Sequence, residues 1–359
     1  MKEAMFYEKL DDKKVQCHLC AFNCLIPEGQ VGRCRVRKNI NGKLYSLVYD
    51  KVNTIVVNPI EKKPLYHFAP GSSCLSISTV GCNWQCKFCC NWQTSTAAEI
   101  EGEALTPEEI VKMAIENNCQ GISYTFTEPT IFYELSYETA RLAHQKGLYN
   151  TWVSNGYTNK EPIKKIAPYL DAVTIDFKGS GEEKFLREFS NVPSNKPIYE
   201  ALKEYKKAGI HIEITDLIVP EIGDSSKELK KLVKWIKENL GEETPFHLLR
   251  FFPTYQLLNL PQTPFETLEK AYEIAKKEGL KYVYPVRSKT PLVSADTKTY
   301  RTSNGVYLGN NDNTYCPKCK ELLIKRSSMR TLEYKIKNGK CSFCGEKINI
   351  RGEKWIKKF

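Results

Sequence analysis

The cysteines constrain this chain more than any other feature of its sequence. There are fourteen in 359 residues, and eleven (4 + 3 + 4) fall into three groups separated by short gaps. In a chain whose charged start, Met1 to Asp12, lacks the apolar core of a secretory signal, such spacings indicate metal sites; in a secreted chain they would indicate disulfides. The groups are C-x2-C-x3-C-x9-C at Cys17, Cys20, Cys24 and Cys34; C-x3-C-x2-C at Cys82, Cys86 and Cys89; and C-x2-C-x21-C-x2-C at Cys316, Cys319, Cys341 and Cys344.

The composition is that of a folded protein outside the membrane. Hydrophobic residues make up 41% and charged residues 26% of the chain, which excludes intrinsic disorder. Apolar runs such as Thr54–Val57 are far shorter than the ~18 residues of a membrane span. We therefore expect a cytoplasmic protein with no membrane contact.

The last cysteine group is typical of a zinc ribbon, in which two C-x2-C turns supply four thiolates to one tetrahedral ion. Such a closed shell favours a folding role for the zinc over a catalytic one. The net charge is +11, and residues 311–359 carry +8 of it (13 − 5). This basic tail could attract RNA or another acidic partner, or be a solvated lysine-rich surface.

The middle group follows a predicted strand, Cys74 to Gly81, and consists of three cysteines within eight residues. Iron–sulfur electron carriers bind a [4Fe–4S] cluster through four cysteines. Three thiolates would leave one iron open to a substrate or cofactor. In the competing interpretation Cys90, Cys74 or Cys119 supplies a fourth ligand and closes a ferredoxin-like or zinc site; Cys90, adjacent to Cys89, is awkwardly placed for this.

The first group supplies four thiolates, which suit either a zinc ion or an auxiliary iron–sulfur cluster. Both alternatives stay open for Cys17, Cys20, Cys24 and Cys34.

Strands and helices alternate after the middle group. Thr106-Pro-Glu-Glu109 is a capping box that opens a helix, and a strand near 120–126 and a helix from Thr130 to Lys146 follow. Further strands are expected near 148–154, 171–177, 210–219 and 245–251, with helices near 159–168, 196–208, 226–239 and 264–278. This pattern predicts an α/β protein with a partial (β/α)6 TIM-type barrel over 71–310, between an N-terminal cysteine segment (1–70) and a C-terminal ribbon (311–359).

Polar residues follow the predicted strands, where barrels carry their reactive groups. Glu128 follows one strand, Ser154 and Asn155 the next, and Asp176 and Lys178 the one after. Asp176 and Lys178 are two residues apart, so both should point into the barrel. His247 and Arg250 close a later strand. Each has a structural alternative: Glu128 as a helix cap, Asp176–Lys178 as a charge pair, and Ser154-Asn155-Gly156 as a turn.

The C-x3-C-x2-C spacing, with aromatic Phe88 before its last cysteine, resembles the signature of the radical S-adenosylmethionine (SAM) superfamily. The resemblance implies a [4Fe–4S] cluster at Cys82, Cys86 and Cys89. Cleavage of SAM there would yield methionine and a 5′-deoxyadenosyl radical that abstracts hydrogen. It also implies SAM contacts from Glu128, where Phe126 and Thr127 replace the glycines of a Gly-Gly-Glu-like segment, from Ser154 and Asn155, and from Asp176 and Lys178. Asp-x-Lys matches the glycyl-radical activating enzymes. His247 and Arg250 could line the adenine or substrate side.

The order of motifs resembles one subgroup, the radical SAM member of the AmmeMemoRadiSam system, over nearly the whole chain. In this chain Cys90 replaces a usual glutamine, and Pro285 to Gly305 looks inserted. The matching stretches are Cys17–Cys24, Gly32–Arg37, Leu44–Tyr49, Pro59–Leu65, Thr79–Cys82 through Asn91-Trp92, Tyr124–Thr130 and Asn313–Pro317.

We therefore expect an activase-like oxidoreductase that takes electrons from a ferredoxin or flavodoxin. Its hydrogen donor, a protein or a small molecule, is not specified by the sequence, nor is the oligomeric state. The alternative is a non-catalytic iron–sulfur or zinc module that carries electrons or binds nucleic acid. That alternative explains the cysteines but not the polar residues at successive strand ends.

Overall fold

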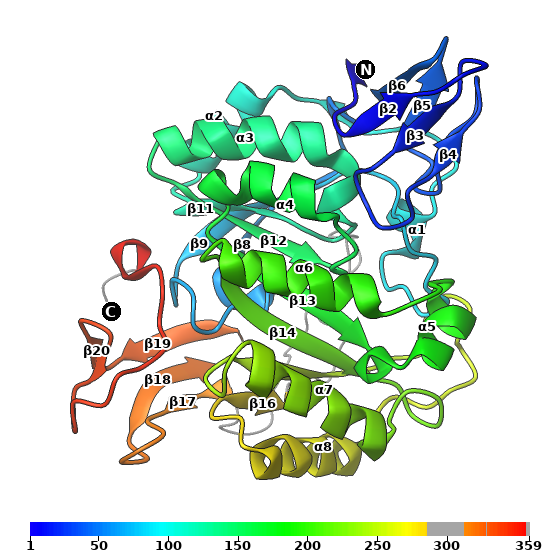
Figure 1. Ribbon diagram of the computed structural model, residues 1–359. Coiled ribbons are helices and arrows are strands. Elements are labelled where there is room, and N and C mark those ends of the chain that lie inside the picture. The colour runs from blue at the N-terminus through cyan, green and yellow to red at the C-terminus, as the bar shows by residue number, and fades with distance from the viewer. Residues whose placement is uncertain (286–311, 328, 357–359) are drawn as a thin grey trace.

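The computed structural model describes residues 1–285, 312–327 and 329–356 (Figure 1). Its centre is an eight-stranded sheet in the order β16-β15-β14-β13-β12-β11-β9-β8. β8 (Thr54–Pro59) pairs antiparallel with β9 at one edge. The other seven strands are parallel: β9 (Ser73–Ser78), β11 (Gly121–Tyr124), β12 (Tyr149–Ser154), β13 (Ala172–Lys178), β14 (His211–Ile218), β15 (Phe246–Arg250) and β16 (Val283–Pro285). The expected α/β class and the alternation of strands and helices are confirmed.

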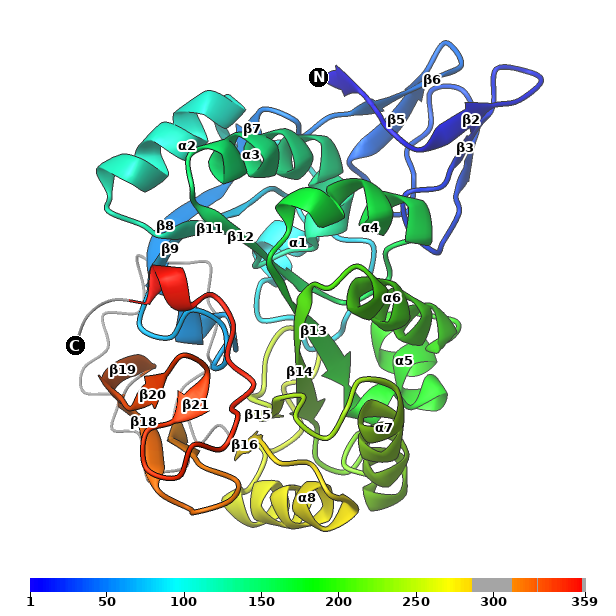
Figure 2. The same ribbon diagram turned by 60° about the vertical axis from the view of Figure 1, so that its left-hand side comes forward.

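Helices connect the parallel strands and cover the outer face of the sheet (Figures 1 and 2). α7 shows why they pack there: Leu229, Leu232, Val233 and Ile236 form a buried stripe at the spacing of one helix face. The capping box at Thr106 is present, with Glu109 bonded back to it. The connecting helices are α2 (Pro107–Glu116), α3 (Tyr133–Gln145), α4 (Lys160–Ile166), α6 (Lys196–Lys207), α7 (Ser226–Asn239) and α8 (Phe265–Glu278); α1 (Trp92–Ser95) and α5 (Glu183–Ser190) are short additions.

The N-terminal residues form a small β module beside α1 and α4 (Figure 1). A buried Arg37 donates to both oxygens of Glu134 on α3, at 2.8 and 2.9 Å, and so fixes the module to the sheet domain. The module ends before residue 70, because β8 already belongs to the large sheet. Its strands are β1 (Lys2–Glu3), β5 (Arg37–Ile40) and β6 (Lys43–Ser46) in one sheet, β2 (Tyr7–Lys9), β3 (Val15–Cys17) and β4 (Leu25–Ile26) in a second, and β7 (Lys51–Val52) paired with β10 (Glu103–Ala104).

The C-terminal residues form a second small β module at the amino ends of the large sheet's strands (Figure 2). Buried Arg326 donates to the Tyr66 carbonyl at 2.6 Å, and the backbone of Arg351 bonds to those of His67 and Ala69. The module contains β17 (Thr314–Tyr315), β18 (Leu322–Ser327), β19 (Arg330–Tyr334), β20 (Ile336–Lys337) and β21 (Lys340–Cys341). The expected insertion from Pro285 to Gly305, apart from Pro285 itself, lies outside the described residues.

No helix in the described residues combines the length and the apolar character that a membrane crossing requires.

Candidate functional site

The loop with Cys82, Cys86 and Cys89 begins where β9 leaves the sheet. Gly81 turns the chain with a φ of +93° and lies against the N-terminal module. A Cβ at Gly81 would come within 2.6 Å of the Val36 side chain and 2.9 Å of the Cys34 carbonyl oxygen. Only glycine fits this turn, and the turn directs the loop across the carboxyl ends of the strands.

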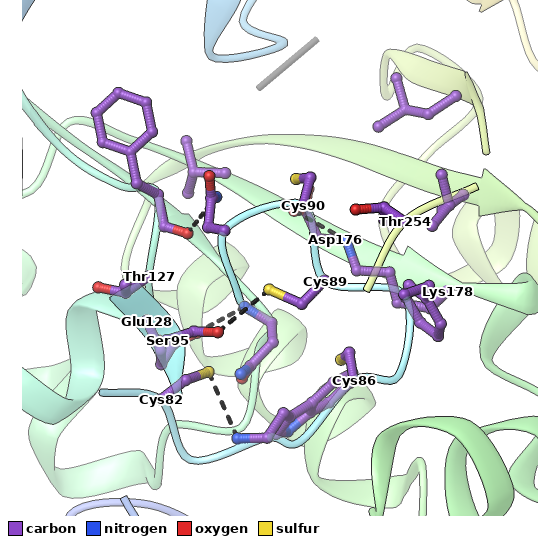
Figure 3. Close-up of a pocket in the computed structure, with 18 of the residues that line it drawn as sticks. Cys82, Cys86, Cys89, Cys90, Ser95, Thr127, Glu128, Asp176, Lys178 and Thr254 are labelled. Carbon is purple, nitrogen blue, oxygen red and sulfur yellow. Dashed lines mark hydrogen bonds and ion pairs between the residues drawn. The ribbon is translucent and has the colours of Figure 1, made fainter. Parts of the chain in front are cut away.

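The three cysteines line one pocket, and Figure 3 shows their side chains grouped around a common space. Each sulfur has a polar neighbour. The Trp84 backbone N–H donates to Cys82 at 3.4 Å, Ser190 Oγ lies 3.4 Å from Cys86, and Ser95 Oγ lies 3.2 Å from Cys89. Hydrogen bonds to cysteine sulfur tune the potential of an iron–sulfur cluster, so these groups suit a redox site.

The chemistry of this donor set fits a metal cluster. Burial raises the pKa of the Cys82 and Cys89 thiols and raises that of Cys86 to about 12. Free thiols here are therefore neutral near pH 7, and binding of a metal would displace their protons. The three sulfurs do not lie within 4.8 Å of one another, so they are too far apart to share one tetrahedral ion.

The remaining cysteines do not complete a four-thiolate site in this pocket. Cys90 also lines the pocket, but in Figure 3 its side chain points away from the space enclosed by the other three. Cys74 is buried beside Asn58, with its sulfur 3.6 Å from that residue's carbonyl oxygen. Cys119 follows α2, with its sulfur 3.9 Å from the carbonyl oxygen of Asn117. Neither Cys74 nor Cys119 lines the pocket.

Glu128, Ser154 and Asn155 lie together at the ends of β11 and β12. The buried Glu128 carboxylate accepts from Thr130 N–H (3.0 Å), Ser154 Oγ (2.9 Å) and Asn155 N–H (2.8 Å). The capping role weighed from the sequence is thus present, because Glu128 caps the short helix Pro129–Phe132. Burial raises the pKa of Glu128 even though these donors oppose the rise. The carboxylate both faces the pocket and holds the two strand ends together.

Asp176 and Lys178 face the pocket from the end of β13, as their two-residue spacing predicts. Lys178 Nζ lies 3.2 Å from Asp176 Oδ2, and Thr215 donates to Asp176 Oδ1 at 2.5 Å. Burial by itself disfavours the lysine charge, but the Asp176 carboxylate outweighs it and raises the pKa of Lys178. Lys178 is therefore a fixed cation beside the cysteine loop.

Arg250 and His247 are separated although both belong to β15. Arg250 lines the pocket, donates to the Thr263 carbonyl at 2.8 Å and lies over the Phe265 ring at 4.1 Å. His247 does not line the pocket, which corrects the expectation that this side chain borders adenine or substrate. It lies deeper along the strand and meets Glu213 at 2.8 Å. Leu249, which faces the same side of the strand, occupies the pocket wall in its place.

Phe126 keeps a backbone conformation that glycine adopts most easily. Its φ is +65°, and its carbonyl oxygen accepts from Asn91 Nδ2 at 2.7 Å. Lys63 Nζ lies 4.3 Å from the centre of its ring. The Phe126-Thr127 segment thus follows a left-handed path beside the pocket despite its side chains.

The pocket has a volume of about 320 Å³, which lies in the range of small-molecule sites. Its walls combine the cysteine loop and the polar strand ends with apolar side chains that include Phe88, Leu217, Leu249 and Phe251. An apolar wall opposite a few charged groups suits a charged nucleoside such as SAM.

The C-terminal cysteines converge as expected of a metal site. The sulfurs of Cys316, Cys319, Cys341 and Cys344 all lie within 4.8 Å of one another. Cys316 and Cys344 are 3.6 Å apart, and Cys319 and Cys341 are 3.7 Å apart. This group could hold one metal ion.

Several site residues were not predicted. Ser190, on α5, reaches Cys86 across 104 residues of sequence, and nothing in its neighbourhood suggests this contact. Ser95 and Asn91 follow the cysteine loop so closely that their polar side chains could have been included. Asn83 lies inside the motif and accepts from Asn155 Nδ2 at 2.8 Å.

The similarity of this chain to known proteins agrees with this geometry. The model of the radical SAM superfamily matches residues 76–236. An uncharacterized protein of Methanocaldococcus jannaschii is 43% identical over 359 residues, 98% of this chain and 99% of that protein. The pyruvate formate-lyase-activating enzyme of Clostridium pasteurianum is 26% identical over 192 residues, 50% of this chain and 77% of that enzyme. The 4-hydroxyphenylacetate decarboxylase activating enzyme of Clostridium scatologenes is 23% identical over 158 residues, which are 44% of this chain and 47% of that enzyme.

The radical SAM match contains the cysteine loop, Glu128, Ser154, Asn155, Asp176 and Lys178. The similarity to the Methanocaldococcus jannaschii protein extends over both flanking modules as well. Residues 76–236 therefore match a radical SAM domain, and the whole chain shares a full-length family with the Methanocaldococcus jannaschii protein.

Proposed function

We propose that this chain is an activase-like radical SAM enzyme whose Cys82, Cys86 and Cys89 hold a [4Fe–4S] cluster with one open iron. The observation that carries the proposal is the grouping of three thiols around one space, from which the Cys90 side chain points away, in a pocket large enough for a nucleoside. When bound, the cluster supplies the single electron that cleaves SAM to methionine and a 5′-deoxyadenosyl radical.

The residues of the chain would bind and orient SAM. Glu128, Ser154 and Asn155, which line the pocket, would hold the methionine end of SAM beside the cluster site. Asp176 and Lys178 provide opposite charges 3.2 Å apart on its facing wall. Arg250 and the phenylalanines beside it would border the adenine and limit entry of water.

We propose that the large sheet forms the partial TIM-type barrel expected within 71–310, and the position of its polar groups at the carboxyl ends of parallel strands supports this. We place the chain in the AmmeMemoRadiSam subgroup, in a reducing cytoplasm, with a zinc ribbon at 311–359 and an N-terminal metal-binding segment within 1–70.

The substrate class that we propose is a partner protein, as the names of the activating-enzyme relatives suggest. The basic ribbon could also meet RNA or another acidic partner, and a ferredoxin or flavodoxin would supply electrons.

The test is SAM cleavage by anaerobic protein reduced with dithionite. We expect 5′-deoxyadenosine from the wild type and a loss of at least about 1,000-fold in Cys86→Ala, since the cluster would lose a ligand. The matched control is Cys119→Ala, which removes a thiol outside the pocket. Undiminished cleavage by Cys86→Ala would overturn the proposal.

A further inference from the structure

The four N-terminal cysteines form a second group directly behind the pocket loop. Cys17 ends β3, and its N–H donates to the Cys24 carbonyl at 2.9 Å across a tight loop that also contains Cys20. Cys34 follows Gly32, and a Cβ at Gly32 would lie 3.9 Å from Cβ of Cys24. Cys20 lies in the turn of the Cys17–Cys24 loop, where its carbonyl accepts from the Asn23 N–H at 3.0 Å. One end of the N-terminal module therefore presents four neighbouring thiols.

Their spacing differs from that of the C-terminal cysteines. Among the described residues, no three of the N-terminal sulfurs come within 4.8 Å of one another, whereas all four C-terminal sulfurs do. A tetrahedral zinc with bonds of about 2.3 Å requires sulfurs about 3.8 Å apart. A [4Fe–4S] cube holds its thiolates farther apart, because each binds a different iron. The wider spacing is shared with Cys82, Cys86 and Cys89.

Two residues connect the N-terminal group with the pocket loop. Arg33, which precedes Cys34, donates from Nε to the Asn83 carbonyl at 3.0 Å and also to the carbonyl of Asn191. A cation in this position would stabilise anionic clusters on both sides.

Asn83 is the second connection. Its side chain is 1% exposed, and its Oδ1 lies 3.8 Å from the Cys82 sulfur. Its Nδ2 makes no hydrogen bond of normal geometry in the described part of the chain. A buried amide hydrogen without a partner requires an explanation, and cluster sulfur is a suitable acceptor.

We propose that a second iron–sulfur cluster, which relays single electrons to the pocket cluster, is held by Cys17, Cys20, Cys24 and Cys34. This inference rests on the proposed function. A low-potential one-electron carrier, of the ferredoxin or flavodoxin class, is oxidised by one electron as it reduces the N-terminal cluster. That cluster returns to its oxidised state as it reduces the pocket cluster. The same electron finally enters SAM, where the C5′–S bond breaks and methionine leaves with the sulfur's electron pair.

Metal content tests the second cluster independently of the first. The full-length triple variant Cys82→Ala, Cys86→Ala, Cys89→Ala is purified anaerobically, reconstituted with iron and sulfide, and analysed for both and for zinc. We expect about 4 iron and about 4 sulfide per chain, half the wild-type content, with a Mössbauer spectrum of a [4Fe–4S] cluster that SAM does not change. Zinc at these cysteines, with no iron bound, would overturn the inference.

The matched variant Cys20→Ser, Cys24→Ser separates this inference from the proposed function. If the N-terminal cluster exists but the pocket cluster does not, this variant loses all its iron. If both exist, it keeps about 4 iron that respond to SAM.

The relay is tested with two reductants. Small dithionite should reach the pocket cluster in Cys20→Ser, Cys24→Ser and support 5′-deoxyadenosine formation within about threefold of wild type. Reduced ferredoxin should be at least about tenfold less effective with the variant than with wild type. Equal ferredoxin-driven rates would exclude the relay. If the variant loses both clusters, the relay is tested in wild type that is mixed with reduced ferredoxin, freeze-quenched and followed by EPR. The SAM-insensitive signal of the N-terminal cluster should appear before the SAM-sensitive signal of the pocket cluster. The reverse order would overturn the relay.

Discussion

Asn155 donates from Nδ2 to Oδ1 of Asn83 over 2.8 Å, and this bond joins the end of β12 to the cysteine loop. The Asn155 backbone N–H donates at the same time to Glu128, at 2.8 Å. The loop that would hold the cluster and the strand ends that would hold SAM are thus fixed to one another by a single residue.

Asn155→Ala should weaken SAM binding more than it weakens cluster binding. The change leaves Asn83 Oδ1 without its donor and frees the loop from β12, at a cost of about 1–3 kcal/mol. We expect roughly tenfold weaker SAM binding with iron content unchanged, measured by equilibrium dialysis against labelled SAM. Asn117→Ala, at an exposed position at the end of α2, is the control. Wild-type affinity in Asn155→Ala would mean that this connection does not position SAM.

Glu134→Gln should destabilise the whole protein. Arg37 and Glu134 are 2% and 1% exposed, and the substitution leaves a buried guanidinium without its counter-charge. The expected loss is about 3–5 kcal/mol in the free energy of unfolding, measured by urea denaturation. Glu116→Gln removes an exposed pairing with Lys112 and should cost less than about 0.5 kcal/mol. Equal effects would show that the N-terminal module is fixed by other contacts.

Stability should fall between pH 6.5 and pH 4.5 because of His67. Its Nδ1 faces the Asn349 carbonyl at 2.8 Å, and its Nε2 meets the Tyr284 hydroxyl at 2.5 Å. Burial outweighs the Glu213 carboxylate and lowers the pKa of His67 to about 3 from 6.5. The neutral form is therefore required in the fold: its contribution is complete above pH 6.5 and is lost as the pH falls toward 3. The slope is about 1.4 kcal/mol per pH unit for this proton.

Urea titrations from pH 7.5 to 4.5 measure this slope. His67→Gln should lower stability at pH 7.5 and flatten its dependence on pH, whereas His144→Gln, at an exposed position on α3, should leave the dependence unchanged. An unaltered slope in His67→Gln would assign the acid sensitivity to other groups.

If Cys316, Cys319, Cys341 and Cys344 hold the proposed metal ion, its loss should unfold the C-terminal module before it affects the pocket. Cys344→Ser removes one of four converging thiols, while the ribbon contacts the amino ends of the strands and the pocket lies at their carboxyl ends. We expect loss of about one metal ion per chain, and proteolysis within 312–356 that wild type resists. Dithionite-driven SAM cleavage per folded chain should stay within about twofold. A proportionate loss of cleavage would show that the ribbon contributes to the pocket.

Helices and strands with a strong hydrophobic period could be predicted from the sequence. The depth of a side chain along its strand could not. The stripe of Leu229, Leu232 and Ile236 and the capping box at Thr106 define α7 and α2 from sequence. The two-residue period correctly placed Asp176 and Lys178 on one face. It could not distinguish His247 from Leu249, which share a face of β15, because period two gives the face of a side chain but not its depth along the strand.

Contacts between distant segments also escaped prediction. The strands of the N-terminal module are two to four residues long and too short for a period to emerge. Ser190 reaches Cys86 only because α5 folds back over the loop, and the ribbon's place at the amino ends of the strands depends on Arg326 and Tyr66, 260 residues apart. These contacts arise from tertiary packing.

The most direct test of the open iron is pulsed EPR of the reduced, full-length protein with SAM labelled with ¹⁵N at the methionine amino group. The account predicts that SAM changes the signal of the pocket cluster and that a ¹⁵N hyperfine coupling appears, absent in Cys86→Ala. A reduced signal that SAM leaves unchanged, with no coupling to the label, would contradict it.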